Sequence, residues 1–184
     1  MMDLEVKVDN NSFHARASAI IYNKDKTKVL LFKVNDGRDF YLLPGGRIKF
    51  NEDSKSAIKR EIEEGTGYKL EYELCSIDEI FLKKDNKNIM QYNFCYKAIY
   101  NGLIEKDYFD CLDCGDQTFH WINISDIDSI KMFPINVKKY IVDVSKSVSQ
   151  KEVLIFVKIR KDKEKCIVFY LVELKLEWIW LVIN

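Results

Sequence analysis

The chain has 184 residues, which suits one domain of ordinary size and leaves too little for two. Hydrophobic residues make up 47% of the sequence and aromatic residues 13%, a composition that allows a sizeable core and argues against disorder. The 29 Lys and Arg residues balance the 29 Asp and Glu residues, and this zero net charge argues against a general nucleic-acid binder.

The first part of the chain alternates apolar stretches with polar turns. Three strands are predicted, over residues 15–22, 29–34 and 40–43. The polar residues 23–28 indicate a hairpin turn between the first two strands. Pro44, Gly45 and Gly46 end the third strand, because proline and glycine interrupt regular structure.

A helix is predicted next. Asp53 is a suitable N-cap, and Ala57, Ile58 and Ile62 form a short apolar stripe at helical spacing. Gly67 is a natural C-terminal stop, since glycine adopts the left-handed backbone that often ends helices.

Strands and helical segments follow in turn. Strands are predicted over residues 70–81, 89–100 and 118–122, and helical segments over residues 125–130 and 135–144. The polar residues 83–88 indicate the clearest hairpin turn. The order of strands, helix, strands and helix predicts an α+β or mixed α/β fold.

The composition changes near residue 145. A polar link is followed by the strongly apolar stretches 153–160 and 166–184, with a charged turn between them. We therefore predict a domain over residues 1–145 and a C-terminal extension over residues 146–184. The extension could add a hairpin to the sheet or form an amphipathic element on a partner. Its apolar surface needs a cover, either the sheet or a second chain, as in a homodimer.

The five cysteines and the N-terminal residues bear on the compartment. No apolar run approaches the ~20 residues of a membrane span, and the N-terminus lacks the apolar core of a secretory signal. We therefore expect a cytoplasmic protein without a membrane partner, and reduced thiols. Cys111 and Cys114 form a lone CxxC pair. A zinc ribbon would need a second pair and His120 is a weak third ligand, so we interpret the two as loop thiols.

Acidic residues concentrate in the predicted helix. Glu61 and Glu64 are three residues apart and share one face, whereas Glu63 points to the opposite side. Glu52 lies just before the helix and could fold back over the shared face. Arg60 is four residues from Glu64 and could orient it.

Carboxylates that converge raise each other's pKa, so something must offset the cost. Hard divalent cations do so, and oxygen ligands suit Mg²⁺ or Mn²⁺. The Gly45-Gly46 turn adds a backbone that a ligand can approach closely. These parts suggest metal-assisted attack of water on a phosphoanhydride. A solvated helix face with internal ion pairs would explain the charged helix alone, but not its spacing from the turn.

The spacing resembles the signature of the Nudix family, G-x5-E-x7-R-E-U-x-E-E-x-G-U, where U is apolar. The matching positions are Gly46, Glu52, Arg60, Glu61, Ile62, Glu64, Gly67 and Tyr68. One fixed position departs, because the second Glu of the EE pair falls on Gly65. The flanking segments 40–46 and 119–127 agree with the family as well, and the resemblance covers about residues 13 to 142.

The resemblance implies an α/β/α sandwich with a mixed sheet. It also implies hydrolysis of a nucleoside diphosphate linked to another group, with Mg²⁺ or Mn²⁺ as cofactor. Carried over by position, Glu61 and Glu64 would be metal ligands and catalytic residues together with Arg60, and Glu52 would support the metal directly or through Arg60.

Gly45, which precedes the signature, and the glycines of the signature have their own expected roles. Gly45 and Gly46 would shape the binding turn, and Gly67 would close the helix. Asn51 falls where many members carry glycine, a mild departure because Asn tolerates left-handed backbone.

Gly65 leaves two interpretations open. Either metal binding survives on Glu61, Glu64 and a carboxylate from elsewhere, or the chain is a weakened or inactive module that binds nucleotides or a protein partner. An interaction protein built on the apolar tail ranks third. Further carboxylates near predicted strand ends, each more easily read as surface, are Asp78, Glu79, Glu105 and Asp116. The substrate is not identified, because it depends on loops outside the signature.

Overall fold

The structure is a computed structural model that describes residues 1–84, 86–133, 137–146 and 154–156. Its elements, in chain order, are β1 (Glu5–Val8), β2 (Asn11–Asn23), β3 (Lys28–Val34), β4 (Tyr41–Leu42), β5 (Gly45–Arg47), α1 (Ser54–Thr66), β6 (Glu73–Lys84), β7 (Lys87–Tyr100), β8 (Tyr108–Asp110), β9 (Gln117–Asn123), a 3₁₀ turn (Ile124–Asp126), β10 (Met132–Phe133), α2 (Val137–Lys146) and β11 (Leu154–Phe156).

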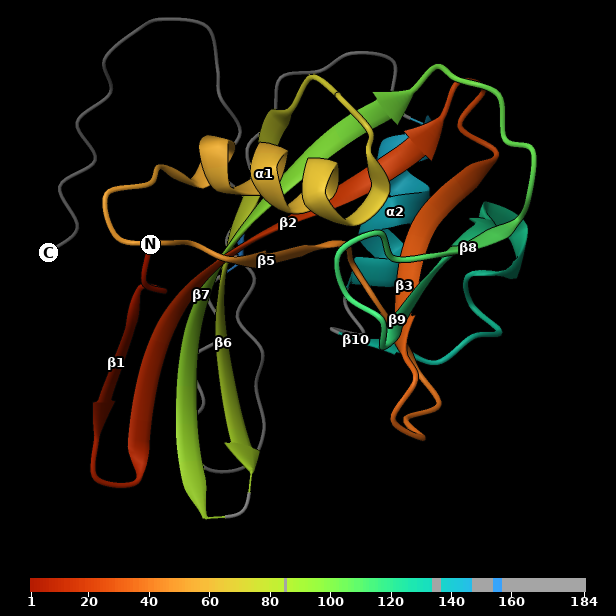
Figure 1. The fold of residues 1–184 in the computed structure, drawn as a ribbon. Helices are drawn as coiled ribbons and strands as arrows, with labels where there is room; N and C mark the ends of the chain where they lie inside the picture. Colours follow the sequence, from red (N-terminus) through yellow and green to blue (C-terminus); the bar gives the residue numbers. More distant parts are fainter. Residues whose placement is uncertain (85, 134–136, 147–153, 157–184) are drawn as a thin grey trace, which may run out of the picture.

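One mixed sheet forms the centre of the molecule (Figure 1). Its main path runs β10-β4-β3-β2-β7-β6-β11. β2 pairs in parallel with β7 along its whole length, from Asn11 opposite Asn88 to Asn23 opposite Tyr100. The predicted hairpin between residues 15–22 and 29–34 is confirmed, since β2 and β3 are antiparallel neighbours. β5 also pairs with β2 and brings the glycine turn onto the sheet.

The two helices cover opposite faces of this sheet (Figure 1). Alternate residues of β2 serve the two cores, because successive side chains of a strand point to opposite faces. Ala17 and Ala19 join the core that contains Ile58 and Ile62 of α1. Ile20 joins the core under α2. The predicted α/β/α sandwich is therefore confirmed.

Helix α1 begins and ends where the sequence predicts. The Asp53 side chain accepts hydrogen bonds from the backbone N–H groups of Lys55 (3.0 Å) and Ser56 (2.9 Å), which caps the first turn. Gly67 has a φ of 74° and donates its N–H to the carbonyl of Glu63. Both predicted ends of this helix are confirmed.

Some elements differ from the expectation. Only a 3₁₀ turn at Ile124–Asp126 forms where a helix was predicted over residues 125–130. The sequence also did not indicate β1, β5, β8 and β10. These strands are short and depend on a neighbour rather than on local pattern, and β10, for example, consists of two residues opposite β4.

The C-terminal part contributes one described strand. β11 pairs in parallel with residues 76–78 of β6, so the chain beyond residue 145 adds to the sheet at least there. The remainder of the apolar extension lies outside the described residues, as do residue 85 in the predicted turn and residues 134–136 before α2. The boundary near residue 145 stays a prediction. Within the described ranges, no helix combines the length and the apolar character that crossing a membrane requires.

Candidate active site

The glycine turn before α1 is held on β2. Gly45 has a φ of 135°, and a Cβ atom there would fall 2.1 Å from the carbonyl oxygen of Ala17, so only glycine fits. The Nη2 group of Arg16 donates to the carbonyl oxygens of Gly45 (2.7 Å) and Leu43 (3.3 Å). The backbone and a side chain of β2 therefore both fix the turn.

The second glycine makes room for a carboxylate. A Cβ atom on Gly46 would lie 1.9 Å from Oε2 of Glu61, so the Glu61 carboxylate occupies the space that the missing side chain leaves. Burial lowers the pKa of the Arg16 guanidinium and the nearby negative charge of Glu61 raises it. Glu61 thus sits against the turn, within electrostatic range of Arg16.

Arg60 connects the acidic residues of the signature. Its guanidinium forms a two-point contact with Glu52, from Nε to Oε1 (2.8 Å) and from Nη2 to Oε2 (3.0 Å). Its Nη1 donates to Glu61 (2.6 Å) and to Glu64 (3.1 Å). A further bond reaches the carbonyl of Arg47 (3.1 Å). One cation therefore holds the three carboxylates together, as the shared helix face predicts.

Glu52 is the most enclosed of the three carboxylates. Its side chain is 11% exposed, and Oε2 also accepts the backbone N–H of Lys49 (2.9 Å). The hydrogen bonds from Arg60, followed by the backbone bond at Lys49, hold the pKa of Glu52 below its ordinary value, although burial opposes this. The contact with Glu52 is likewise the main cause that raises the pKa of Arg60.

This contact gives a pH-dependent prediction. At pH 7, Glu52→Gln should lower the free energy of unfolding by about 1–2 kcal/mol, because charge-assisted hydrogen bonds are lost. The folded pKa of Glu52 lies below the unfolded value of 4.5, so its contribution is complete above pH 4.5 and disappears as the pH falls through the folded pKa. Urea unfolding of both proteins between pH 3 and 7 measures this. A constant difference across that range would contradict the assignment.

The other two carboxylates are open to solvent. The side chain of Glu61 is 24% exposed and that of Glu64 is 43% exposed. Glu63 stands apart, as predicted, and pairs with Lys69 at 3.1 Å. With one guanidinium among three carboxylates, the cluster keeps a negative excess and offers hard oxygen donors. Such a donor set fits a divalent cation of the Mg²⁺ or Mn²⁺ type.

Gly65 is packed rather than open. A Cβ atom there would lie 3.2 Å from the Phe119 ring and 3.5 Å from Sγ of Cys111. Its carbonyl accepts the backbone N–H of Leu112 (2.9 Å). The position that lacks the expected carboxylate is therefore in contact with β9 and with the segment before it. A longer side chain would start inside this packing.

The other candidate carboxylates lie elsewhere. Asp78 accepts hydrogen bonds from Asn93 (3.2 Å) and Ser76 (3.3 Å), and burial raises its pKa. Glu79 accepts a hydrogen bond from Tyr92 (2.7 Å). Within the described part of the chain, neither of these two residues, nor Glu105 nor Asp116, belongs to a group of potential metal ligands with Glu61 or Glu64.

A cavity of about 710 Å³ lies apart from this cluster. It is lined by the end of β7 and the segment after α1, including Lys69, Tyr72 and Tyr100. Glu52, Glu61 and Glu64 do not line it. Because none of the signature's carboxylates lines the cavity, we do not assign it to the substrate.

Arg16 is the residue that sequence reasoning missed. The signal was present, since Arg16 is the only charged residue in the otherwise small and apolar stretch 15–22. An arginine inside such a strand needs partners, and here they are the carbonyls of the glycine turn. Asn51, expected to tolerate left-handed backbone, does adopt it, with a φ of 61°.

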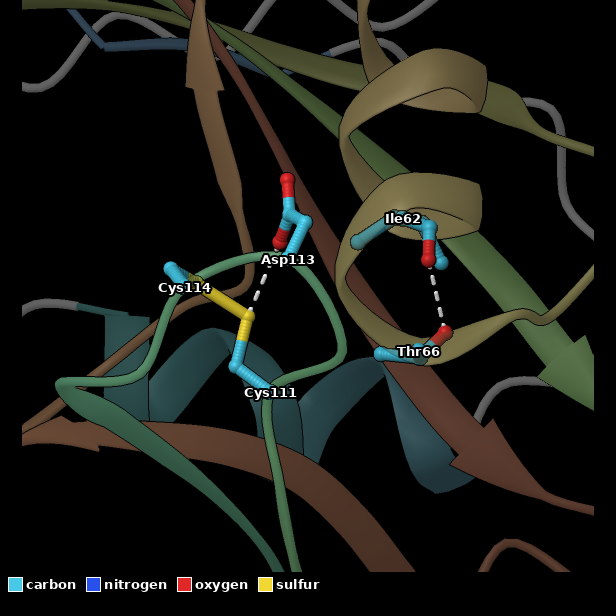
Figure 2. The surroundings of a disulfide bond; sticks show 5 residues. All are labelled: Ile62, Thr66, Cys111, Asp113 and Cys114. Atoms are coloured by element: carbon cyan, nitrogen blue, oxygen red, sulfur yellow. Dashed lines mark hydrogen bonds between the residues drawn. A yellow bond between two sulfur atoms is a disulfide. The ribbon is translucent and has the colours of Figure 1, made fainter.

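The expectation of reduced thiols is wrong for two cysteines. Cys111 and Cys114 form a disulfide, because the tight connection between β8 and β9 brings their Cα atoms to 5.4 Å (Figure 2). Cys75 and Cys95 are free and buried, as expected of reduced residues. Cys166 lies outside the described residues.

The NUDIX domain family model matches residues 12–141, which include the glycine turn, the Arg60 cluster and α1. The chain belongs to the Nudix family. No curated protein matches this Nudix chain.

Solved structures share the Nudix fold. A MutT protein from Bacillus halodurans is 20% identical, with a TM-score of 0.58, over 78% of this chain and 88% of its own. The E. coli dihydroneopterin triphosphate pyrophosphohydrolase is 13% identical, with a TM-score of 0.57, over 70% and 92%. The Nudix domain of Shewanella oneidensis NrtR, in complex with ADP ribose, is 16% identical, with a TM-score of 0.57, over 76% and 90%. At these identities the likeness concerns the fold.

Proposed function

We propose that this Nudix protein hydrolyses the pyrophosphate of a nucleoside diphosphate linked to another group, by attack of water with Mg²⁺ or Mn²⁺. The observation that carries the proposal is the cluster in which Arg60 holds Glu52, Glu61 and Glu64 beside the Gly45-Gly46 turn. A solvated helix face would not need a glycine turn shaped around one of its carboxylates.

The three carboxylates have different roles in this proposal. Glu61 and Glu64 would hold the cation, because both are partly exposed and each makes one hydrogen bond to Arg60. Glu52 is a positioning residue, since both its oxygens are already used by Arg60 and Lys49. The bound cation would neutralise phosphate charge and lower the pKa of an attacking water.

The remaining residues prepare the site. Arg60 keeps the carboxylates convergent despite their repulsion, so less reorganisation is needed when a ligand arrives. Arg16 fixes the carbonyls of Gly45 and Leu43, and this orients the backbone of the turn that a phosphate would approach. Gly67 acts on the site only by ending α1.

The substrate class rests on the fold relatives. Two of them are a triphosphate pyrophosphohydrolase and a domain bound to ADP ribose, and both names point to phosphoanhydride-bearing ligands. They support a soluble nucleotide derivative as the substrate here. The cytoplasmic location stays a prediction from the sequence. A homodimer remains a prediction from the apolar extension.

Gly65 favours one second candidate, a module that binds nucleotides or a protein partner without turnover. The position that carries a carboxylate in the signature is packed against Phe119 and Cys111 instead. Hydrolysis and binding must therefore be measured separately.

A panel of nucleoside diphosphate sugars, dinucleotides and nucleoside triphosphates, assayed with Mg²⁺, with Mn²⁺ and with a chelator, tests the proposal. We expect metal-dependent release of a nucleoside monophosphate or of pyrophosphate from at least one class. Isothermal titration with non-hydrolysable analogues separates the alternatives. Tight binding without turnover would favour the second candidate as a nucleotide-binding module, and neither binding nor turnover would contradict both hydrolysis and nucleotide binding.

A further inference from the structure

The segment with Cys111 and Cys114 is fixed beside the last turn of α1 (Figure 2). The backbone N–H of Cys111 donates to the carbonyl of Gln117 (3.0 Å) at the start of β9. The N–H of Leu112 donates to the carbonyl of Gly65 (2.9 Å) in α1. The segment is therefore anchored to a strand and to a helix, and its side chains have defined positions.

Three side chains of this segment place their potential metal-ligand atoms close together. The sulfurs of Cys111 and Cys114 and a carboxylate oxygen of Asp113 all lie within 4.8 Å of one another. Cys111 is buried, Cys114 is partly buried and Asp113 is exposed. The group thus has an enclosed side against α1 and an open side toward solvent, from which a small ligand can enter.

The contact between Asp113 and Cys111 points to a second state. Oδ1 of Asp113 lies 3.1 Å from Sγ of Cys111 (Figure 2). A disulfide sulfur carries no hydrogen, so in the oxidised form this contact lacks a donor. The same arrangement becomes favourable when Cys111 is a thiol that donates to the carboxylate, or when both atoms bind one cation.

We propose that Cys111, Cys114 and Asp113 bind one Zn²⁺ ion when the disulfide is reduced, and that the disulfide is the metal-free state. Two equivalents of a thiol reductant convert the disulfide into two cysteine thiols and are themselves oxidised to a disulfide. Zn²⁺ then binds the two thiolates and the carboxylate, and the two thiol protons are released. Water completes the tetrahedral coordination.

This site differs in chemistry from the carboxylate cluster. Thiolates select Zn²⁺ and similar soft cations, whereas the oxygen donors of Glu61 and Glu64 suit Mg²⁺ or Mn²⁺. The proposal therefore does not depend on the hydrolytic function. It adds a reducible metal site in contact with Gly65, at the end of the helix that carries the signature.

The test uses the full chain with Cys166→Ser, so that the cysteine outside the described residues cannot contribute. The protein is reduced, freed of metal and titrated with Co²⁺ and with Zn²⁺ against a chromophoric chelator. We expect the reduced protein to take up one equivalent of each ion more than the oxidised protein does, and to show the near-ultraviolet thiolate-to-Co²⁺ absorption that the oxidised protein lacks. Bound Zn²⁺ should also protect Cys111 and Cys114 from alkylation, as read by mass spectrometry.

Variants of the segment assign the ligands. Cys111→Ser and Cys114→Ser should each lose the equivalent, and Asp113→Asn should weaken Zn²⁺ binding by at least about 10-fold. Asp110→Asn is the matched control, since Asp110 is an exposed carboxylate of β8 outside the group, and it should bind like the parent. Circular dichroism verifies that each variant is folded.

Three results would overturn the proposal. The first is a reduced protein that takes up no more of either ion than the oxidised protein does. The second is reduction-dependent uptake that persists when Cys111 and Cys114 are both replaced by Ser. The third is equal Zn²⁺ affinity of Asp113→Asn and Asp110→Asn, which would remove Asp113 from the ligand set. The alkylation pattern of the unsubstituted pair gives an independent answer if a Ser variant fails to fold.

Discussion

Glu61→Gln is expected to lower metal-dependent hydrolysis by at least about 100-fold while the fold is retained, since losing a metal ligand costs more than losing an outer partner. Gln has nearly the same shape, so it fits the space beside Gly46 that Glu61 occupies. It lacks the charge that would hold a divalent cation. Steady-state hydrolysis with Mg²⁺ or Mn²⁺, together with urea unfolding, measures both effects.

Glu63→Gln is the matched control for this substitution. Glu63 lies on the same helix, half exposed and paired with Lys69 rather than with Arg60. Its replacement changes the net charge of α1 by the same amount but leaves the cluster intact, so activity should be unchanged. Equal loss in both variants would indicate a general effect of charge and would contradict the role of Glu61.

Gly65→Glu is expected to have two opposing effects. It should lower the free energy of unfolding by about 1–3 kcal/mol, because the new side chain starts against the Phe119 ring and Cys111. The better helix propensity of Glu offsets at most about 1 kcal/mol of this loss in the free energy of unfolding. In contrast, Mg²⁺ or Mn²⁺ should stabilise the variant more than the parent and raise its turnover, since residue 65 is one turn from Glu61.

The two effects are separated by urea unfolding with and without the metal, and by hydrolysis assays of both proteins. Gly65→Ala is the control, because it brings the Cβ contact without the carboxylate. If the metal stabilises Gly65→Glu and Gly65→Ala to the same extent, a carboxylate at position 65 does not reach the cation. Another segment would then have to supply the missing ligand.

The features that could be predicted from the sequence are local. The cap at Asp53, the stop at Gly67 and the shared face of Glu61 and Glu64 all depend on residues within one or two turns, and each is present in the structure. The Nudix signature also predicted the glycine turn, because it specifies the number of residues between that turn and the helix.

The remaining features depend on contacts between distant segments. Arg16 is separated from the turn by many residues, and only the pairing of β2 with β5 brings them together. The sequence showed that Gly65 lacks a carboxylate but not that Phe119 and Cys111 contact it. The disulfide joins residues only three positions apart, but the CxxC pair alone does not show how the connection between β8 and β9 directs the two sulfurs.

The parallel pairing of β2 with β7 has a consequence for the order of assembly. Partners across this ladder, such as His14 and Gln91, are 77 positions apart in the chain. Closing so long a loop lowers the entropy of the chain, and this cost arises before the pairing of the two strands can stabilise the structure. During synthesis, the turn, α1 and its carboxylates emerge first, but the core beneath them is complete only after β7 and β9, which supply Tyr96, Ala98, Phe119 and Trp121, leave the ribosome. The acidic cluster, although contiguous in sequence, therefore rests on a core whose parts are far apart along the chain.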